Sequence, residues 1–318
     1  MLKAALIPTF SPEHISRFSD IEGVSIEWDA LSRAEVILGN PTDAQIAACP
    51  NLKWIQLTNA GVNNYVNRPA LKERNILLTC ASGAFGQSIS ECVLAMVLSL
   101  YKHLNLFRDN QNEAVWRDAG RQMSPCGKNL LVLGAGNIGM CVAKIFKPFG
   151  VRTVGVRTRA GEGDDLFEKY TTFAELDDYL PKADIVVCAL PETKDTIGLL
   201  DARRISLLSP SAILVNVGRG SLIDCDALAD ALNKGSLYGA ALDVTNPEPL
   251  PAGHPLWKCK NAVITPHATG GSFGHLTETE EKIFEITREN LKRYLSGAQL
   301  LNVVDLEKGY RTEKNRAE

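Results

Sequence analysis

The stretch Leu130–Gly139, LLVLGAGNIG, constrains the fold more than any other part of the chain. An apolar run ends there in Gly134, Gly136 and Gly139, which have the spacing G-x-G-x-x-G. Between a strand and a helix, the first glycine permits a tight turn, the second lets a pyrophosphate approach the backbone, and the third permits close helix–strand packing. The helix start also offers free N–H groups to phosphate. The stretch therefore predicts a dinucleotide-binding α/β unit, with a glycine turn that serves packing alone as the alternative.

Short apolar runs alternate with amphipathic segments along the whole chain, a pattern typical of parallel sheets covered by helices on both faces. Strands are expected at residues 4–7, 34–40, 53–61, 75–83, 130–133, 153–156, 185–190, 213–217, 239–244 and 263–265. Helices are expected at residues 12–20, 42–49, 88–107, 137–150, 224–235 and 280–297. The strands form two series, and a length of 318 residues allows two domains. The last helix could return to the first series, and we expect the tail, residues 307–318, to be disordered.

Composition argues against several classes of function. The net charge is −3 with interspersed signs, which gives no basic surface for nucleic acid or anionic lipid. No apolar stretch approaches the ~18 residues of a membrane span, and the first apolar run is too short for a secretion signal. Eight cysteines are scattered without a C-x-x-C pair or a histidine cluster. We therefore expect a cytoplasmic protein with free, core-packed thiols and no metal site.

The segment 88–107 predicts one long helix. Ser88 and Glu91 suggest a capping box at its start, and apolar residues recur on two of its faces. Such a helix is expected to cross between domains or to pack in a dimer. A polar stretch with Trp116 follows, which suggests either a contact across a subunit boundary or a surface loop.

Three side chains with complementary chemistry follow strands of the second series. Arg219 lies between two glycines, Glu248 lies in a proline-flanked turn, and His267 follows a proline. Each of them alone could be structural. Because ligands bind at the carboxyl ends of parallel strands, the three together suit hydride transfer to a carbonyl. The histidine would supply a proton, the acid would orient it, and the arginine would bind an anionic substrate.

Five segments in this order and spacing resemble the D-isomer-specific 2-hydroxyacid dehydrogenase family: GAGNIG, ALPETKDT, VNVGRGSLID, ALDVTNPEPLP and TPHATGG. The resemblance implies two Rossmann-like, doubly wound domains of class α/β in a homodimer. It implies that a dinucleotide-binding domain, residues 101–286, is inserted into a substrate domain, residues 1–100 and 287–318. It also implies a small 2-keto or 2-hydroxy acid as substrate, with no nucleic-acid or membrane partner.

The resemblance also assigns roles to residues. Arg219 would bind substrate, His267 would be the general acid and base, and Glu248 would be its partner. The backbone N–H groups of Ala60, Gly61 and Val62 would hold the substrate carboxylate. The expected cofactor-binding residues are Gly134, Gly136, Asn137, Ile138, Gly139, Arg157, Thr158, Arg159, Leu190, Pro191, Val217 and Asp243.

The chain departs from the family at Arg157. Many members have an acid there, which bonds to the ribose hydroxyls of NAD and would repel a 2′-phosphate. Here Arg157 and Arg159 flank Thr158. We therefore expect a preference for NADP(H), with NAD(H) possible if these side chains only face solvent.

The sequence thus predicts an NADPH-preferring 2-keto acid reductase and leaves the keto acid open. One alternative is an NAD-linked phosphoglycerate-type dehydrogenase, which the short segment after the last helix disfavours. Another is a nucleotide-sensing binding protein on the same scaffold, which the complete set of Arg219, Glu248 and His267 disfavours.

Overall fold

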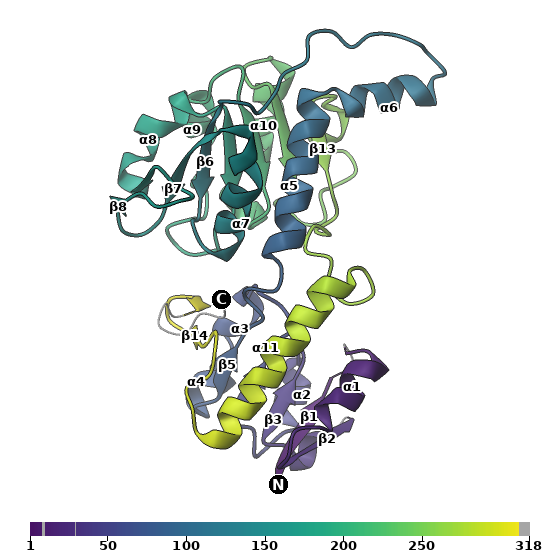
Figure 1. The fold of residues 1–318 in the computed structure, drawn as a ribbon, viewed down its shortest axis with the longest axis vertical. Coiled ribbons are helices and arrows are strands. Elements are labelled where there is room, and N and C mark those ends of the chain that lie inside the picture. Colours follow the sequence, from purple (N-terminus) through teal and green to yellow (C-terminus); the bar gives the residue numbers. More distant parts are fainter. Residues whose placement is uncertain (8–9, 29, 312–318) are drawn as a thin grey trace. The chain divides into compact units, whose positions relative to one another are not determined.

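A computed structural model of the chain describes residues 1–7, 10–28 and 30–311. It divides into two compact α/β units (Figure 1). The second unit is Gly86–Gly270, and the chain before and after it forms the first. The α/β class is as predicted.

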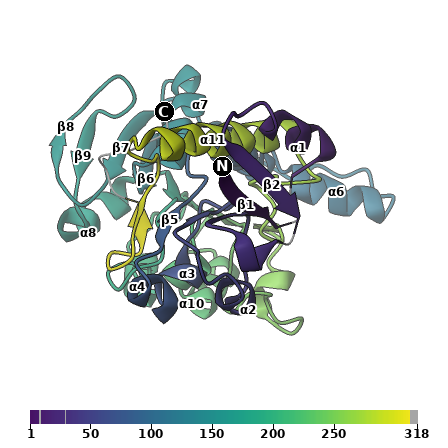
Figure 2. The same ribbon diagram turned by 90° about the horizontal axis from the view of Figure 1, so that it is seen from below.

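The first unit contains a five-stranded parallel sheet in the order β2-β1-β3-β4-β5. The strands β1 and β2 lie side by side at one edge (Figure 2). Its strands are β1 (Leu2–Leu6), β2 (Val24–Trp28), β3 (Val36–Leu38), β4 (Trp54–Gln56) and β5 (Leu77–Thr79). Its helices are α1 (Pro12–Phe18), α2 (Asp43–Ala47), α3 (Asn63–Val66), α4 (Pro69–Glu73) and α11 (Thr277–Ser296). The edge strand β2 was not expected from the sequence. None of its residues is fully buried, so it lacks the apolar run that marks a central strand.

Helices cover both faces of this sheet because neighbouring residues of a strand point to opposite sides. Ile55 of β4 packs in a core cluster with Ile46 of α2 and Leu71 of α4. Trp54, the preceding residue, stacks on Tyr294 of α11 at 5.1 Å between ring centroids. The helix α11 therefore packs as part of the first unit along its length.

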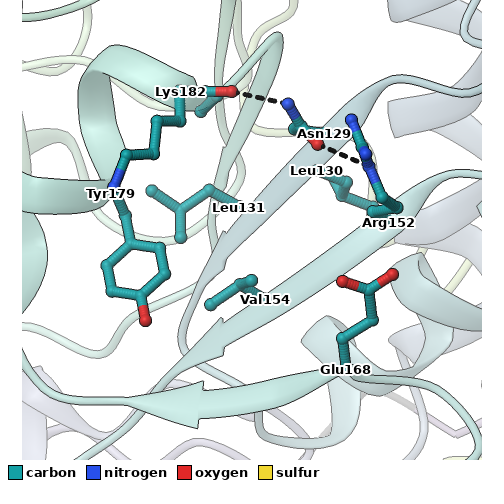
Figure 3. A pocket seen from close by; sticks show the side chains of 9 residues that line it. Asn129, Leu130, Leu131, Arg152, Val154, Glu168, Tyr179 and Lys182 are labelled. Atoms are coloured by element: carbon teal, nitrogen blue, oxygen red, sulfur yellow. Dashed lines mark hydrogen bonds between the residues drawn. The ribbon is translucent and has the colours of Figure 1, made fainter.

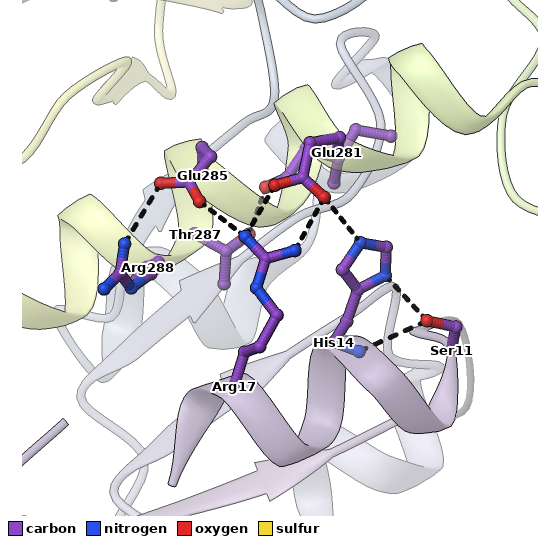
Figure 4. Close-up of polar contacts among 8 residues, drawn as sticks. Ser11, His14, Arg17, Glu281, Glu285, Thr287 and Arg288 are labelled. Carbon is purple, nitrogen blue, oxygen red and sulfur yellow. Dashed lines mark hydrogen bonds and ion pairs between the residues drawn. The ribbon is translucent and has the colours of Figure 1, made fainter. Parts of the chain in front are cut away.

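A polar cluster joins α11 to α1 (Figure 4). The guanidinium of Arg17 donates two hydrogen bonds to the carboxylate of Glu281, at 2.7 and 2.6 Å. His14 Nε2 lies 3.2 Å from the same carboxylate, and its ring stacks on Phe284. The Arg17 hydrogen bond is the main reason that the pKa of Glu281 falls to about 2. These contacts give His14 a structural role.

The second unit contains an eight-stranded sheet in the order β13-β12-β11-β10-β6-β7-β9-β8. Its strands are β6 (Asn129–Leu133), β7 (Arg152–Val156), β8 (Gly161–Glu162), β9 (Lys169–Thr171), β10 (Ile185–Cys188), β11 (Ile213–Asn216), β12 (Gly239–Leu242) and β13 (Ala262–Ile264). Its helices are α5 (Gly86–Tyr101), α6 (Leu104–Asn112), α7 (Asn137–Phe146), α8 (Leu176–Tyr179), α9 (Ala202–Ser206) and α10 (Cys225–Asn233). All pairs except β8–β9 are parallel. The order reverses between β6 and β10, where such sheets bind ligands.

The predicted helix over residues 88–107 is wrong in two respects. The chain forms α5 and α6, separated at His103, whose φ of 57° is incompatible with a continuous right-handed helix. Ser88 also does not cap α5, because the helix begins at Gly86 and the Ser88 hydroxyl instead donates to Thr269 O. The apolar residues of one face of α5 are buried, and those of the other are partly open.

The boundaries of the units differ from those expected at residues 100 and 287. The helix α5 packs along α7 of the second unit, so the first boundary lies at Phe85/Gly86. A Cβ on Gly86 would stand 2.6 Å from both Asn137 Oδ1 and Cys141 Sγ, which shows how closely the two helices meet. The second boundary lies at Gly270/Gly271, because α11 packs entirely in the first unit.

Other expectations about the chain hold in part. All eight cysteines are free thiols, but Cys126 is exposed and Cys92 and Cys141 are only half-buried. Tyr310–Arg311 (β15) pairs with Val304–Asp305 (β14), which contradicts disorder at the start of the tail. Residues 312–318 lie outside the described part of the chain. Among the described helices, none is long and apolar enough to cross a bilayer.

Candidate active site

The three glycines after β6 are each required for a different reason. Gly134 has a φ of +102°, and a Cβ there would stand 2.7 Å from Ala189 O. A Cβ on Gly139 would stand 2.2 Å from Gly134 O, inside the turn. No described atom lies within 4 Å of a Cβ built on Gly136. Since α7 begins at the next residue, a phosphate can approach the backbone at Gly136 and meet the free N–H groups of the helix start.

The side chain of Arg157 lies just beyond β7 and folds onto β9. Its guanidinium carbon is 3.7 Å from the ring centroid of Tyr170, and its Nε donates to Arg159 O at 2.9 Å. Arg157, Thr158 and Arg159 are all exposed. They are therefore accessible to a bound nucleotide.

Asp164, seven residues further along the chain, comes near Arg157. The Tyr170 hydroxyl donates to Asp164, which also accepts hydrogen bonds from two backbone N–H groups. These bonds, first that from Tyr170, and the charge of Arg157 hold the pKa of Asp164 below its usual value. This neighbour was not predicted from the sequence.

Arg219 stands in a turn that has no room for other side chains. A Cβ on Gly218 would lie 2.7 Å from Leu190 O, and one on Gly220 would lie 1.8 Å from Thr245 O. The turn therefore passes against the ends of both neighbouring strands. Burial lowers the pKa of the Arg219 guanidinium, while the charges of two carboxylates, Glu192 and Glu248, oppose that effect.

Glu248 and His267 form the predicted pair. His267 Nδ1 lies 2.7 Å from Glu248 Oε1, and both side chains are about half exposed. The backbone of His267 is left-handed, with a φ of 54°, which is unusual for a residue other than glycine and occurs at functional sites. Its N–H donates to Asp243 O at 2.8 Å. The pair leaves Nε2 as the ring nitrogen that can exchange a proton with a ligand.

Asp243 has a role that the sequence analysis missed. Its carboxylate, on a residue only 4% exposed, accepts hydrogen bonds from Thr265 Oγ1 at 2.6 Å, Thr269 Oγ1 at 2.6 Å and Ala268 N at 2.9 Å. It therefore organises the turn that carries His267. No local sequence signal marks this role, because the partners lie more than twenty residues away.

The other predicted residues are distributed over the two units. Leu190 and Val217 are buried at the ends of β10 and β11, and Pro191 is exposed beside them. Asn137 and Ile138 form the first turn of α7. Ala60, Gly61 and Val62 lie between β4 and α3 in the first unit, and their contact with substrate remains a prediction.

A pocket of about 350 Å³ lies elsewhere in the second unit (Figure 3). It is lined at one end by Asn129 and Arg152, the first residues of β6 and β7, and also by Tyr179 and Lys182. Because the glycine turn and Arg219 follow the carboxyl ends of their strands, this pocket is at the opposite edge of the sheet. Among the described residues, no group of three or more His, Cys, Asp or Glu side chains is arranged to hold a metal ion.

Comparison with known proteins supports the site. Residues 94–269 match the sequence profile of the D-isomer specific 2-hydroxyacid dehydrogenase, NAD binding domain. The chain belongs to this family. It is therefore an oxidoreductase that interconverts a small 2-keto acid and a 2-hydroxy acid with a nicotinamide cofactor.

Individual relatives span most of the chain. It is 30% identical to a glyoxylate reductase of Thermofilum pendens, over 82% of this chain and 77% of that protein. It is 29% identical to a glyoxylate/hydroxypyruvate reductase B of Pectobacterium carotovorum, over 96% and 94%. A D-isomer specific 2-hydroxyacid dehydrogenase of Xanthobacter autotrophicus, solved with NADPH and MES, superposes with a TM-score of 0.82 at 27% identity, over 97% and 99% of the two chains.

Proposed function

We propose that this chain is a cytoplasmic, homodimeric reductase that prefers NADPH and acts on glyoxylate, hydroxypyruvate or a similarly small 2-keto acid. The observation that carries the proposal is the 2.7 Å contact between His267 Nδ1 and Glu248 Oε1. Both residues, like Arg219 and the glycine turn, come after the carboxyl ends of strands of the same sheet. The names of the relatives support the substrate class. Eight free thiols suit a reducing compartment.

The residues of the second unit fit a nicotinamide dinucleotide. The open backbone at Gly136 suits the pyrophosphate, and the exposed Arg157 and Thr158 suit the adenosine end. When bound, the reduced cofactor supplies the hydride that reduces C2 of the keto acid.

The chain's own residues would bind the substrate and supply the proton. Arg219 can donate two parallel hydrogen bonds to the keto acid, and the N–H groups of Ala60–Val62 would bind its carboxylate. His267 would give a proton from Nε2 to the carbonyl oxygen, which becomes the hydroxyl. Glu248, as acceptor from Nδ1–H, orients the ring so that Nε2 faces away from the pair.

An activity panel tests this function. NADPH and NADH oxidation would be measured with glyoxylate, hydroxypyruvate, pyruvate, phenylpyruvate and branched keto acids. Turnover is expected to be highest with the smallest acids and NADPH. If the protein binds NADPH but oxidises it with none of these acids, a nucleotide-sensing role replaces catalysis.

Changing Arg219 to lysine is expected to raise KM for the keto acid and to lower turnover. Lysine keeps the charge but loses the planar fork of donors. Because a hydrogen bond to a charged group contributes about 1.5–3 kcal/mol, kcat/KM should fall at least about tenfold. Arg203→Lys is a matched control, since Arg203 only makes a surface ion pair with Asp177 in the same unit. An unaltered KM would leave Arg219 as a structural loop residue.

Dimer formation is expected to involve α5, α6 and the following arm, in which Trp116 is fully exposed. Leu104 and Val115 of the same segment are also exposed, and a group of exposed apolar side chains is typical of an interface. Light scattering at micromolar concentration should give the mass of a dimer, and Trp116→Glu should give monomers. Trp257→Glu is the control, because Trp257 is also exposed, at 51%, but lies outside these elements. A monomeric wild-type protein would contradict the proposal.

A further inference from the structure

A buried chain of hydrogen bonds holds the turn that carries His267. The hydroxyl of Ser88, in the first turns of α5, donates to Thr269 O at 2.7 Å. The hydroxyl of Thr269 donates to Asp243 Oδ2 at 2.6 Å. Ser88, Thr269 and Asp243 are only 7%, 3% and 4% exposed, so water competes little for these bonds.

The position of Thr269 in the turn makes these hydrogen bonds important for holding the backbone near His267. On one side of His267 the backbone is fixed by β13, which ends at Ile264. On the other side come Gly270 and Gly271, and glycine has the greatest backbone freedom of any residue. Thr269 is therefore the last side chain that can anchor the turn before the chain leaves the second unit.

His267 needs such an anchor because its own conformation is unfavourable. A left-handed backbone is strained for a residue other than glycine and persists only where the surroundings impose it. The pairing of His267 with Glu248 does not fix the backbone, since both side chains are about half exposed. The bonds from the turn to Asp243 are what impose it.

We propose that Thr269 is a positioning residue for His267 and that Ser88 holds Thr269 in place. Through Asp243, the Thr269 hydroxyl keeps the imidazole directed at the substrate carbonyl and paired with Glu248. The proposal rests on the function of His267 as proton donor given above.

Thr269→Val tests this, because valine keeps the branched shape and removes the donor. We expect kcat to fall about tenfold, the scale of one lost buried hydrogen bond, while the Kd of NADPH and the KM of the keto acid stay within about twofold. Thr269→Ser retains the hydroxyl and should restore kcat. Ser88→Ala should also lower kcat, but by a smaller factor.

The control separates positioning from simple stability. Thr287 of α11 is equally buried and donates to Ile283 O at 2.8 Å, in the other unit. Thr287→Val should lower Tm without changing kcat. If Thr269→Val lowers only Tm, or if Thr269→Ser is as impaired as Thr269→Val, the proposal is wrong.

Two further outcomes remain distinguishable. If Thr269→Val does not fold, Ser88→Ala decides, and an unchanged kcat in that variant overturns the proposal. If His267→Gln keeps normal turnover, the proposed function itself fails. A large loss in His267→Gln with none in Thr269→Val would retain the function and reject the positioning role.

Discussion

Replacing His267 by glutamine is expected to lower turnover by about 100-fold or more, the usual scale of general acid catalysis. Glutamine is polar and of similar size, but it cannot supply a proton from the place of Nε2. Cofactor binding should persist, because the glycine turn after β6 does not involve His267. Steady-state turnover with NADPH and fluorescence titration of NADPH together measure the two effects.

The matched control is His275→Gln, because His275 lies in an exposed turn of the first unit. It should keep the wild-type rate. Glu248→Gln serves as a companion variant that should lower turnover, since the carboxylate that accepts the hydrogen bond from His267 Nδ1 is lost. Turnover of His267→Gln near the wild-type value would remove His267 from the mechanism.

The parts of the fold that were predictable from the sequence are those set by local sterics and burial. The turn after β6 is one case, since Gly134 needs a positive φ and Gly139 has no room for a Cβ. The central strands are another, because both of their faces are buried and they therefore appear as continuous apolar runs. The capping box of α2 is also local, as Thr42 and Gln45 satisfy each other's backbone N–H groups.

The features that were missed depend on contacts between distant segments. No proline or glycine marks the break between the two helices at His103. The ring of His103 instead contacts the Tyr238 hydroxyl, which is far away in the sequence. The half-open strand β2 forms because β1 offers it a parallel partner. The contacts of Asp243 with the His267 turn likewise arise only when β12 and β13 lie side by side.

The candidate site also contains features that were predictable from the sequence and features that were not. The chemical types at Arg219, Glu248 and His267 were evident, and the fold brings the last two within 2.7 Å. The residues around the site were not evident. Thr269 and Asp164 act through hydrogen bonds with Asp243 and Tyr170, and no sequence pattern predicts these two pairs.

The cofactor preference depends on the charge after β7. Arg157 and Arg159 are both exposed, and the guanidinium carbon of Arg157 lies 3.7 Å from the centroid of the Tyr170 ring. The nearby carboxylate of Asp164 offsets part of the positive charge of Arg157, while Arg159 adds a second positive charge. A 2′-phosphate would therefore meet two arginines, Arg157 and Arg159.

Wild-type protein is expected to favour NADPH over NADH by at least about tenfold in kcat/KM, since each charge-assisted bond to phosphate contributes about 1.5–3 kcal/mol. Arg157→Asp should abolish or reverse this preference. The introduced carboxylate would repel the 2′-phosphate and could accept hydrogen bonds from the ribose hydroxyls of NADH. The change should appear chiefly in the cofactor KM, with little change in the KM of the keto acid. Arg152→Asp makes the same charge change at the amino end of β7 and should leave the preference intact. Equal kcat/KM values for the two cofactors in the wild-type protein would show that Arg157 does not bind the phosphate.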